Sequence, residues 1–181
     1  MRTTGKRTTG KRTTHTVLES KVGPLTIVVT DGALSGLYMQ QQRHRPSPET
    51  LGFPTDDPNE QPFPQVAEQL DAYFAGDLTE FDVPIAMNGT PFQQRVWAAL
   101  QRIPYGETVT YGELAQEIGS PTASRAVGLA NGKNPISVIV PCHRVIGSNG
   151  DLTGYGGGIE RKRFLLDFER TVRHGAEPAL F

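Results

Sequence analysis

Residues 139–145 read IVPCHRV and hold the only cysteine of the 181-residue chain, Cys142, with His143 directly after it. A single cysteine cannot form an internal disulfide bond. A tetrahedral Zn²⁺ site would need further ligands from the four histidines, and no two of them have metal-ligand spacing, so we predict no bound metal. Two interpretations of Cys142 remain: a buried side chain that acts as a small hydrophobe, the commoner fate of a free cysteine, or a nucleophile.

A nucleophilic Cys142 needs a base that removes its proton and a group that orients this base. His143 is the candidate base, but adjacent residues of an extended chain point to opposite sides. Contact would therefore need a bridging water or a sharp turn after Pro141. Asp167 and Glu169 are the carboxylates that could orient the imidazole. If His143 and Glu169 lower the pKa of the thiol, Cys142 reacts with alkylating probes faster than a free cysteine does.

The elements that would position these residues lie in the second half of the chain. TPFQ at residues 90–93 and TYGE at residues 110–113 are capping boxes, and each predicts the start of a helix. The second helix is expected to stop at Gly119, and a third is expected over residues 122–131 after a tight Gly-Ser-Pro turn, which favours a helix-turn-helix. The apolar run at residues 136–140 predicts a strand buried on both faces, and IERKRFLLDFER from residue 159 predicts a further helix.

The first half of the chain resembles a scaffold without obvious chemistry. Two β-rich runs flank Asp31-Gly32, which predicts a hairpin, and apolar residues at 66, 70, 73 and 74 have helical spacing. We divide the chain into a basic, disordered RTTGK-repeat tail (residues 1–15), an N-terminal α+β domain (16–87), a C-terminal domain (88–173) and a short tail (174–181).

The net charge of −1 hides an uneven distribution of charge. Lys and Arg outnumber Asp and Glu by 5 in residues 1–15 and by 2 in residues 91–181, whereas acidic residues are in excess by 8 in residues 16–90. A polyanionic partner is therefore expected at the C-terminal half or at the basic tail. The sequence contains neither a membrane-spanning run nor a secretory signal, so we expect a cytoplasmic protein without a membrane partner.

Three stretches of the second half carry a resemblance to a known protein family. PCHRVIG at residues 141–147, RAVGLANGKNP at 125–135 and FQQRVWAALQRIPYGETVTYGELA at 92–115 resemble the O6-alkylguanine-DNA alkyltransferases, also called methylated-DNA–protein-cysteine methyltransferases. The resemblance implies an α/β (α+β) fold: a small RNase H-like domain of β-hairpin and helix, then a mainly helical domain with a helix-turn-helix. It also implies irreversible transfer of an alkyl group from O6 of guanine, or O4 of thymine, in duplex DNA to Cys142, without a cofactor.

The resemblance further implies how DNA is bound. Arg125 is the finger that fills the gap left by a flipped nucleotide, and Tyr111 helps to rotate that nucleotide and donates to the guanine ring. Ala123, Ala126 and Gly128 on the recognition helix allow close approach to the minor groove, whose degenerate pattern suits an enzyme indifferent to sequence. The implied partner is double-stranded DNA, and the implied oligomeric state is a monomer. Whether several molecules bind cooperatively along DNA is left open.

In the pocket, the resemblance assigns Cys142 as acceptor, His143 as a water-mediated base oriented by Glu169, and Asn134 as a brace for the turn that carries the cysteine. The Val145 carbonyl is expected to accept from the guanine amino group, and Lys162 to support the loop and the departing guanine. Tyr155 and the loop from Gly156 wall the alkyl site. Gly156 stands where many relatives carry serine. The hydroxyl contact to the oxygen of the base would therefore be made by a backbone amide instead.

Each of these residues also has a purely structural explanation when it is taken alone. Tyr111 could be a core aromatic residue, Arg125 and Lys162 solvated charges, and Glu169 a helix-end carboxylate. The rival function is a non-catalytic module that recognises alkylated bases and recruits other repair proteins, a class that lacks the cysteine. Because Cys142 is present, alkyl transfer is the preferred interpretation.

Overall fold

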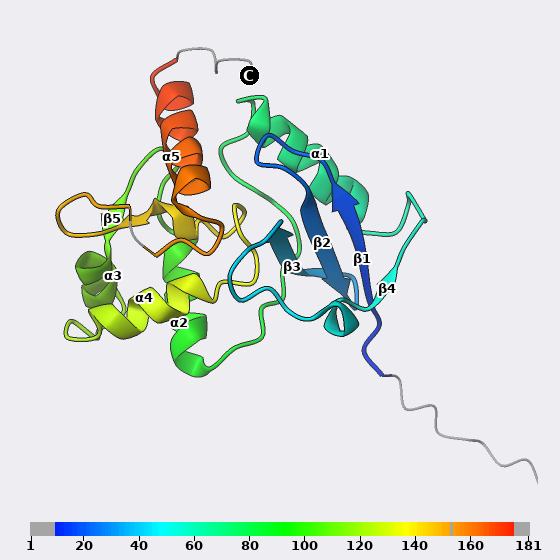
Figure 1. Cartoon of the computed structure of the whole chain (residues 1–181), viewed down its shortest axis with the longest axis horizontal. Coiled ribbons are helices and arrows are strands. Elements are labelled where there is room, and N and C mark those ends of the chain that lie inside the picture. Colours follow the sequence, from blue (N-terminus) through cyan, green and yellow to red (C-terminus); the bar gives the residue numbers. More distant parts are fainter. Residues whose placement is uncertain (1–9, 153, 176–181) are drawn as a thin grey trace, which may run out of the picture.

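A four-stranded sheet forms the centre of the first half of the chain (Figure 1). The computed structural model describes residues 10–152 and 154–175. The strands are β1 (Thr13–Leu18), β2 (Leu25–Thr30), β3 (Ala33–Met39) and β4 (Phe53–Pro54), in the order β3-β2-β1-β4. β2 pairs antiparallel with both β1 and β3, and β4 runs parallel to β1. A short 3-10 helix, η1 (Pro48–Leu51), precedes β4, and α1 (Phe63–Phe74) packs its apolar stripe against the sheet.

The predicted hairpin is confirmed in β2 and β3, where Thr30 pairs with Ala33. The two turn residues, Asp31 and Gly32, have φ values of 49° and 80°. This left-handed conformation is the one that a two-residue hairpin turn requires, and Asp-Gly tolerates it well. The predicted helical spacing is confirmed as well, since Val66, Leu70, Tyr73 and Phe74 of α1 are all buried.

The boundary predicted for the N-terminal tail is wrong by three residues. β1 begins at Thr13, and Thr13, Thr14 and His15 pair with Thr30, Val29 and Val28 of β2. The repeat has no apolar residue in this part, but a strand next to β2 is held by backbone hydrogen bonds, and threonine suits strands. Residues 1–9 of the predicted tail lie outside the described residues, as do residues 176–181 of the C-terminal one.

The second half is mainly helical. It contains α2 (Pro91–Leu100), α3 (Tyr111–Glu117), α4 (Ser124–Gly132) and α5 (Ile159–Arg173), together with a 3-10 turn, η2 (Cys142–Arg144), and the parallel pair β5 (Val109–Thr110) and β6 (Val145–Ile146). Both predicted capping boxes are present, with each threonine hydroxyl accepting from the backbone of the third helical residue. The third predicted helix starts two residues later than expected, at Ser124.

The predicted buried strand at residues 136–140 is wrong. These residues form consecutive turns, in which the amide of Val140 donates to the Ile136 carbonyl at 3.0 Å and Val138 has a φ of 71°. Only Ile136 makes a β-bridge, to Leu37 of β3. The run is apolar because it is buried, as predicted, but burial alone does not distinguish a strand from a buried loop.

One hydrophobic core joins the two halves of the chain. Leu34 and Leu37 of β3 bridge to Ile85 and Ile136, so the sheet holds both the linker and the segment that leads to Cys142. Trp97 of α2 is buried and donates its indole N–H to the Ala130 carbonyl of α4 at 2.9 Å. Within the described part of the chain, every helix is too short or too polar to cross a membrane.

Candidate active site

Cys142 begins the turn η2, directly after Pro141. A sharp turn after Pro141 was one of the two ways, beside a bridging water, in which Cys142 and His143 could act together. The turn is braced from two sides: Asn134 Nδ2 donates to the Val140 carbonyl at 2.8 Å, and Asn131 Nδ2 donates to the Cys142 carbonyl at 3.3 Å. The thiol itself is almost fully buried, with 4% of the residue exposed.

Glu169 of α5 connects the residues around the turn. Its carboxylate accepts hydrogen bonds from His143 Nε2 (2.7 Å), Arg144 Nε (2.9 Å), Arg144 Nη2 (2.8 Å) and the Tyr73 hydroxyl (2.8 Å). His143 and Glu169 are both fully buried. The alternative carboxylate, Asp167, is exposed and lies 3.6 Å from Arg170 on the same helix, so Glu169 is the group that orients the imidazole.

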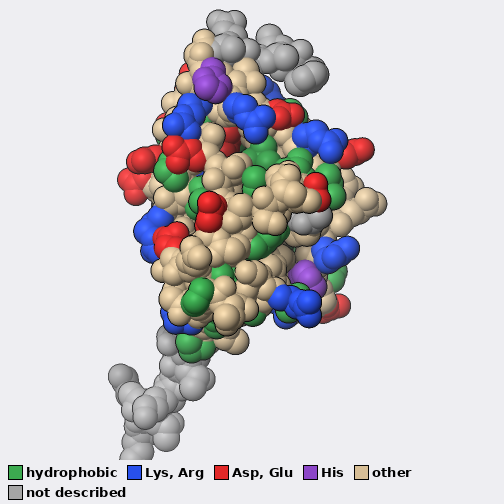
Figure 2. Space-filling model, turned by 90° about the vertical axis from the view of Figure 1, so that its left-hand side faces the viewer, with side chains coloured by type: hydrophobic (Ala, Val, Ile, Leu, Met, Phe, Trp, Pro, Cys, Tyr) green, Lys and Arg blue, Asp and Glu red, His purple; other side chains and the backbone are tan. Residues whose placement is uncertain are grey.

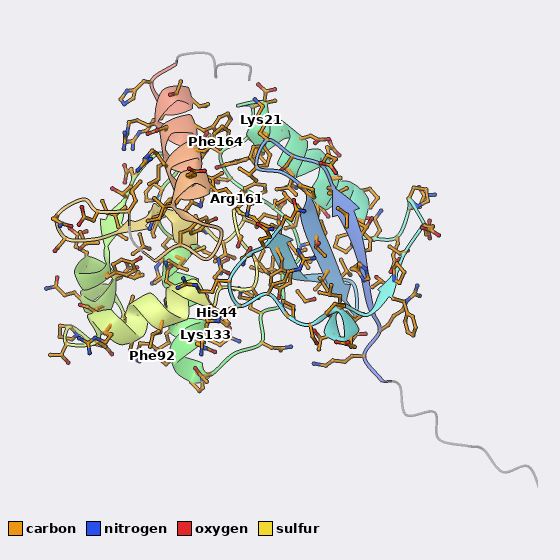
Figure 3. The ribbon with its side chains drawn as sticks, viewed as in Figure 1. Lys21, His44, Phe92, Lys133, Arg161 and Phe164 are labelled. Atoms are coloured by element: carbon orange, nitrogen blue, oxygen red, sulfur yellow. The ribbon has the colours of Figure 1, made fainter. Side chains whose placement is uncertain are left out.

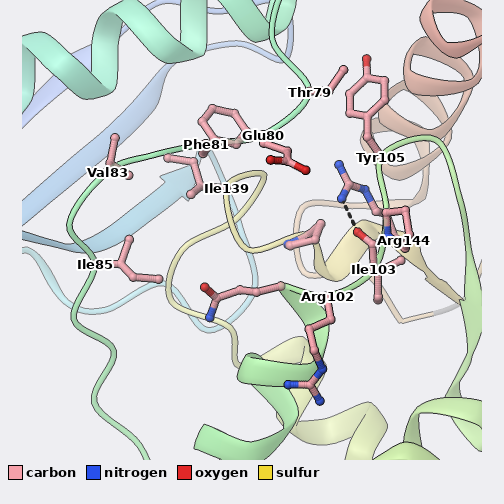
Figure 4. A pocket seen from close by; sticks show the side chains of 13 residues that line it. Thr79, Glu80, Phe81, Val83, Ile85, Arg102, Ile103, Tyr105, Ile139 and Arg144 are labelled. Carbon is pink, nitrogen blue, oxygen red and sulfur yellow. Dashed lines mark hydrogen bonds between the residues drawn. The ribbon is translucent and has the colours of Figure 1, made fainter.

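The charge on Glu169 is stabilised by its partners. Burial on its own opposes ionisation, but the neighbouring His143 and Arg144 outweigh it and hold the pKa of the Glu169 carboxyl well below its usual range. Arg144 is itself fixed, because Nη1 donates to the Ile103 carbonyl at 2.7 Å. Figure 4 shows this bond at the wall of a pocket of about 580 Å³, which opens between residues 79–85 and the segment that follows α2.

Tyr73 is a positioning residue contributed by the first half of the chain, and Tyr73→Phe tests this role. The change removes one donor to a buried carboxylate without leaving a cavity, so we expect a loss of about 1.5–3 kcal/mol in unfolding free energy. Chemical denaturation measures it. Tyr105→Phe is the matched control, because the Tyr105 hydroxyl is buried and has no hydrogen-bond partner among the described residues. Equal stability of the two variants would contradict the role of Tyr73.

The pKa of the Cys142 thiol is raised, because burial disfavours the thiolate and outweighs the opposing effects of Asn134 and Lys162. The condition set for faster reaction with alkylating probes, a thiol pKa lowered by His143 and Glu169, is therefore not met in the protein without substrate. The Cys142 thiolate would lie close enough to Tyr111 and Tyr155 to raise the pKa of each hydroxyl, although burial is the larger cause for both. The three residues thus belong to one site.

Lys162 lies under this site rather than at the surface. It is fully buried, and its ammonium donates to the Val145 carbonyl at 2.5 Å and lies 5.9 Å from the centre of the Tyr111 ring. Burial lowers its pKa to about 8, and the nearby Cys142 acts in the opposite direction. A lysine with this pKa is partly neutral near physiological pH, so it can exchange a proton with its surroundings.

A pocket of about 490 Å³ has Tyr111, Arg125, Gly128, Tyr155 and Gly156 in its lining. Cys142 is not among the lining residues, but it is close to two of them, Tyr111 and Tyr155. Five of the predicted site residues are thus brought together in one cavity. Ala126 is exposed on α4, and Ala123 is the residue that precedes this helix. Neither alanine lines the pocket, although their neighbours Ser124 and Arg125 do.

Sequence reasoning missed several residues of this site. Arg144 could have been found from the sequence, because a charged residue inside an apolar stretch such as IVPCHRV needs a buried partner. Nothing in the sequence pointed to Tyr73 or Asn131, since a tyrosine on an apolar helix face and an asparagine near a helix end are both common. Among the described residues, no group of three or more His, Cys, Asp or Glu side chains is arranged to hold a metal ion.

The chain is similar to known proteins over most of its length. Residues 91–171 match the family described as 6-O-methylguanine DNA methyltransferase, DNA binding domain, and residues 13–87 match the ribonuclease-like domain of the same proteins. The methylated-DNA–protein-cysteine methyltransferase of Mycobacterium tuberculosis is 56% identical over 164 residues, which covers 91% of this chain and 96% of that protein.

A similar relationship holds for an archaeal protein and for a solved structure. The protein of the same name from Methanosarcina acetivorans is 49% identical over 156 residues, covering 86% of this chain and 97% of that one. The crystal structure of Mycobacterium tuberculosis OGT in complex with DNA has a TM-score of 0.82 and 54% identity, and the match covers 88% of this chain and 94% of that chain. Sequence and structure therefore agree on the same relatives.

Proposed function

Because the chain belongs to the methylated-DNA–protein-cysteine methyltransferase family, we propose that it repairs alkylated DNA by moving the alkyl group to its own Cys142. The substrate is O6-alkylguanine, or O4-alkylthymine, in duplex DNA. The C–O bond of the alkylated base breaks, an S–C bond forms at Cys142 Sγ, and the thiol proton ends on the base, which is restored. The thioether is stable, so each molecule acts once and needs no cofactor.

The observation that carries this proposal is the buried pairing of His143 with Glu169 beside the only cysteine. Nε2 of His143 is occupied by Glu169, which leaves Nδ1 as the nitrogen that can take a proton. Nδ1 is buried and has no hydrogen-bond partner among the described residues. A water molecule between Nδ1 and the thiol would satisfy it and relay the proton of Cys142 to the imidazole.

Departure of the guanine is assisted by groups around the pocket. Tyr111 lines the pocket and donates a hydrogen bond to the guanine ring as the C–O bond breaks. The Val145 carbonyl accepts from the guanine amino group: a carbonyl has two lone pairs, and Lys162 uses one of them. Tyr155 and Gly156 enclose the alkyl group.

DNA docks on α4 through the minor groove, and the protein acts as a monomer. Arg125 is exposed at the start of the helix and fills the space that the flipped nucleotide leaves. Ala123, Ala126 and Gly128 keep this surface free of large side chains, so the helix can approach the groove closely. The flipped base then enters the pocket beside Tyr111 and Tyr155. Cys142 is too buried to reach a base that stays stacked in the duplex.

Intact mass spectrometry tests the transfer. The protein is mixed with duplex DNA that carries one O6-methylguanine, and one added methyl group is expected, mapped to Cys142 and absent from Cys142→Ser. An unchanged mass combined with tight binding to the lesion would favour the rival function, a recognition module in which Cys142 is only a buried hydrophobe.

The raised pKa of Cys142 predicts how the thiol behaves without substrate. At pH 7.5 it should react with iodoacetamide at least tenfold more slowly than glutathione, and its rate should rise with pH beyond the range in which glutathione levels off, because less thiolate is present at a given pH. Mass spectrometry of the alkylated protein follows the rate. A reaction faster than that of glutathione would mean that His143 and Glu169 activate the resting thiol.

A further inference from the structure

The pocket lined by Tyr111, Arg125 and Tyr155 has two basic residues that the proposed mechanism does not use. Arg43 and His44, from the loop after β3, line it together with Arg125 and Leu129 of α4. Both side chains are exposed, and within residues 10–152 and 154–175 neither has a hydrogen-bond or ion-pair partner. In contrast, the next residue, Arg45, is bound to the Met39 carbonyl and to Thr26 Oγ1.

The loop is fixed on both sides of these residues. The Arg43 amide donates to the Gly156 carbonyl at 2.8 Å, which ties the loop to the wall of the alkyl site. Gln42 is buried, and its Oε1 accepts from the Met39 amide at 2.9 Å and from the Ser137 hydroxyl at 3.3 Å. Arg43 and His44 are therefore presented from a held backbone, at the junction of the two halves of the chain.

The recognition surface itself lacks the charge that DNA binding requires. Residues 111–133, which contain α3 and α4, have two basic residues, Arg125 and Lys133, and two acidic ones, Glu113 and Glu117. Affinity for DNA comes largely from neutralising phosphates with Lys and Arg, so this segment alone is a poor electrostatic partner for DNA.

In the first half of the chain, positive charge is concentrated in the loop after β3. Residues 16–90 hold three Lys and Arg against eleven Asp and Glu, and two of the three are Arg43 and Arg45. Figure 3 shows His44 and Lys133 beside α4 and Lys21 at the distant end of the molecule. Figure 2 shows two histidines, one near the upper and one near the lower end of this view, and Lys and Arg side chains lie beside each of them.

We propose that Arg43 and His44 form a phosphate clamp: they bind the backbone of the same DNA segment that docks on α4. The clamp rests on the proposed function, because it assumes that DNA occupies the pocket face. It gives the first half of the chain a direct part in substrate binding, beyond that of a scaffold. The guanidinium of Arg43 would form an ion pair with a phosphate, and His44 would add an N–H donor.

The salt dependence of DNA affinity tests the clamp, with the full chain and an undamaged duplex. For Arg43→Gln, the slope of log Kobs against log salt should become less negative by about 0.9, the value for one lost phosphate contact. Binding should also be severalfold weaker, and adding His44→Gln should weaken it further. Arg43→Lys should keep the wild-type slope, since it keeps the charge.

Lys21→Gln is the matched control, because it removes one positive charge far from the pocket and should leave the slope unchanged. Thermal melting of each variant confirms that it folds. An unchanged slope for a folded Arg43→Gln would overturn the clamp. Transfer of the methyl group from O6-methylguanine in duplex DNA to the wild-type protein is measured in parallel: its failure would overturn the proposed transfer to Cys142, whereas the salt slope tests the clamp independently.

Discussion

Glu169→Gln is expected to lower the free energy of unfolding by about 3–5 kcal/mol at neutral pH. Glu169 is fully buried and is the counter-charge of the nearly buried Arg144. Glutamine preserves the shape but removes the negative charge, so a guanidinium is left buried without compensation. One carboxylate oxygen also becomes an NH₂ group, which accepts no hydrogen bond, so donors among His143, Arg144 and Tyr73 lose their acceptor.

The pH dependence of the same variant has a definite sign. The pKa of Glu169 is lower in the folded protein than the value of about 4.3 in an unfolded chain. The unfolded state therefore binds more protons as the pH falls, and the stabilisation by Glu169 is complete above about pH 5 and decreases below it. The stability difference between wild type and Glu169→Gln should shrink as the pH falls below about 4.

Denaturant titrations at several pH values measure this effect. Glu160→Gln is the control, because Glu160 lies on the same helix and is exposed. Alkyl transfer from free O6-benzylguanine to Glu169→Gln, assayed where the variant is folded, should be about 100-fold slower, because His143 loses the group that orients it. A variant as stable as Glu160→Gln at neutral pH would show that Glu169 is not the centre of this network.

Local features of the fold were predictable because their causes are local. A capping box satisfies backbone donors within four residues, and Asp-Gly closes a hairpin through its own backbone preferences. Both capping boxes and the hairpin were therefore confirmed at the predicted positions. The position of Cys142 at the end of a buried apolar run was also evident, although that run is not a strand.

The remaining parts depend on contacts between distant residues. The Tyr73 hydroxyl donates to Glu169, which lies 96 residues later in the sequence, and no local sequence pattern predicts this hydrogen bond. The turns at residues 136–140 form because Asn134 Nδ2 donates to the Ile136 and Val140 carbonyls. In a strand, these carbonyls would accept hydrogen bonds from a neighbouring strand instead. The raised pKa of Cys142 could not be predicted from the sequence because burial, its largest cause, depends on tertiary packing.

Arg125→Ala is expected to slow repair of O6-methylguanine in duplex DNA by about 100-fold. Extrusion of a stacked nucleotide costs a few kcal/mol, and a side chain that fills the gap recovers part of this cost. A factor of 100 corresponds to about 2.7 kcal/mol, which lies within that cost. Arg125 is exposed at the start of α4, so its removal creates no cavity in the core, and the variant should keep its stability.

A series of substrates separates this role from a structural one. The loss should be largest for a lesion in a matched duplex, smaller opposite a mismatch, where flipping costs less, and within about threefold for free O6-benzylguanine, which is not flipped. Arg170→Ala is the control, because Arg170 is an exposed arginine on α5, away from α4 (Figure 1). If Arg125→Ala slowed all three substrates equally, Arg125 would shape the pocket, and the energy for base flipping would have to come from other contacts with DNA.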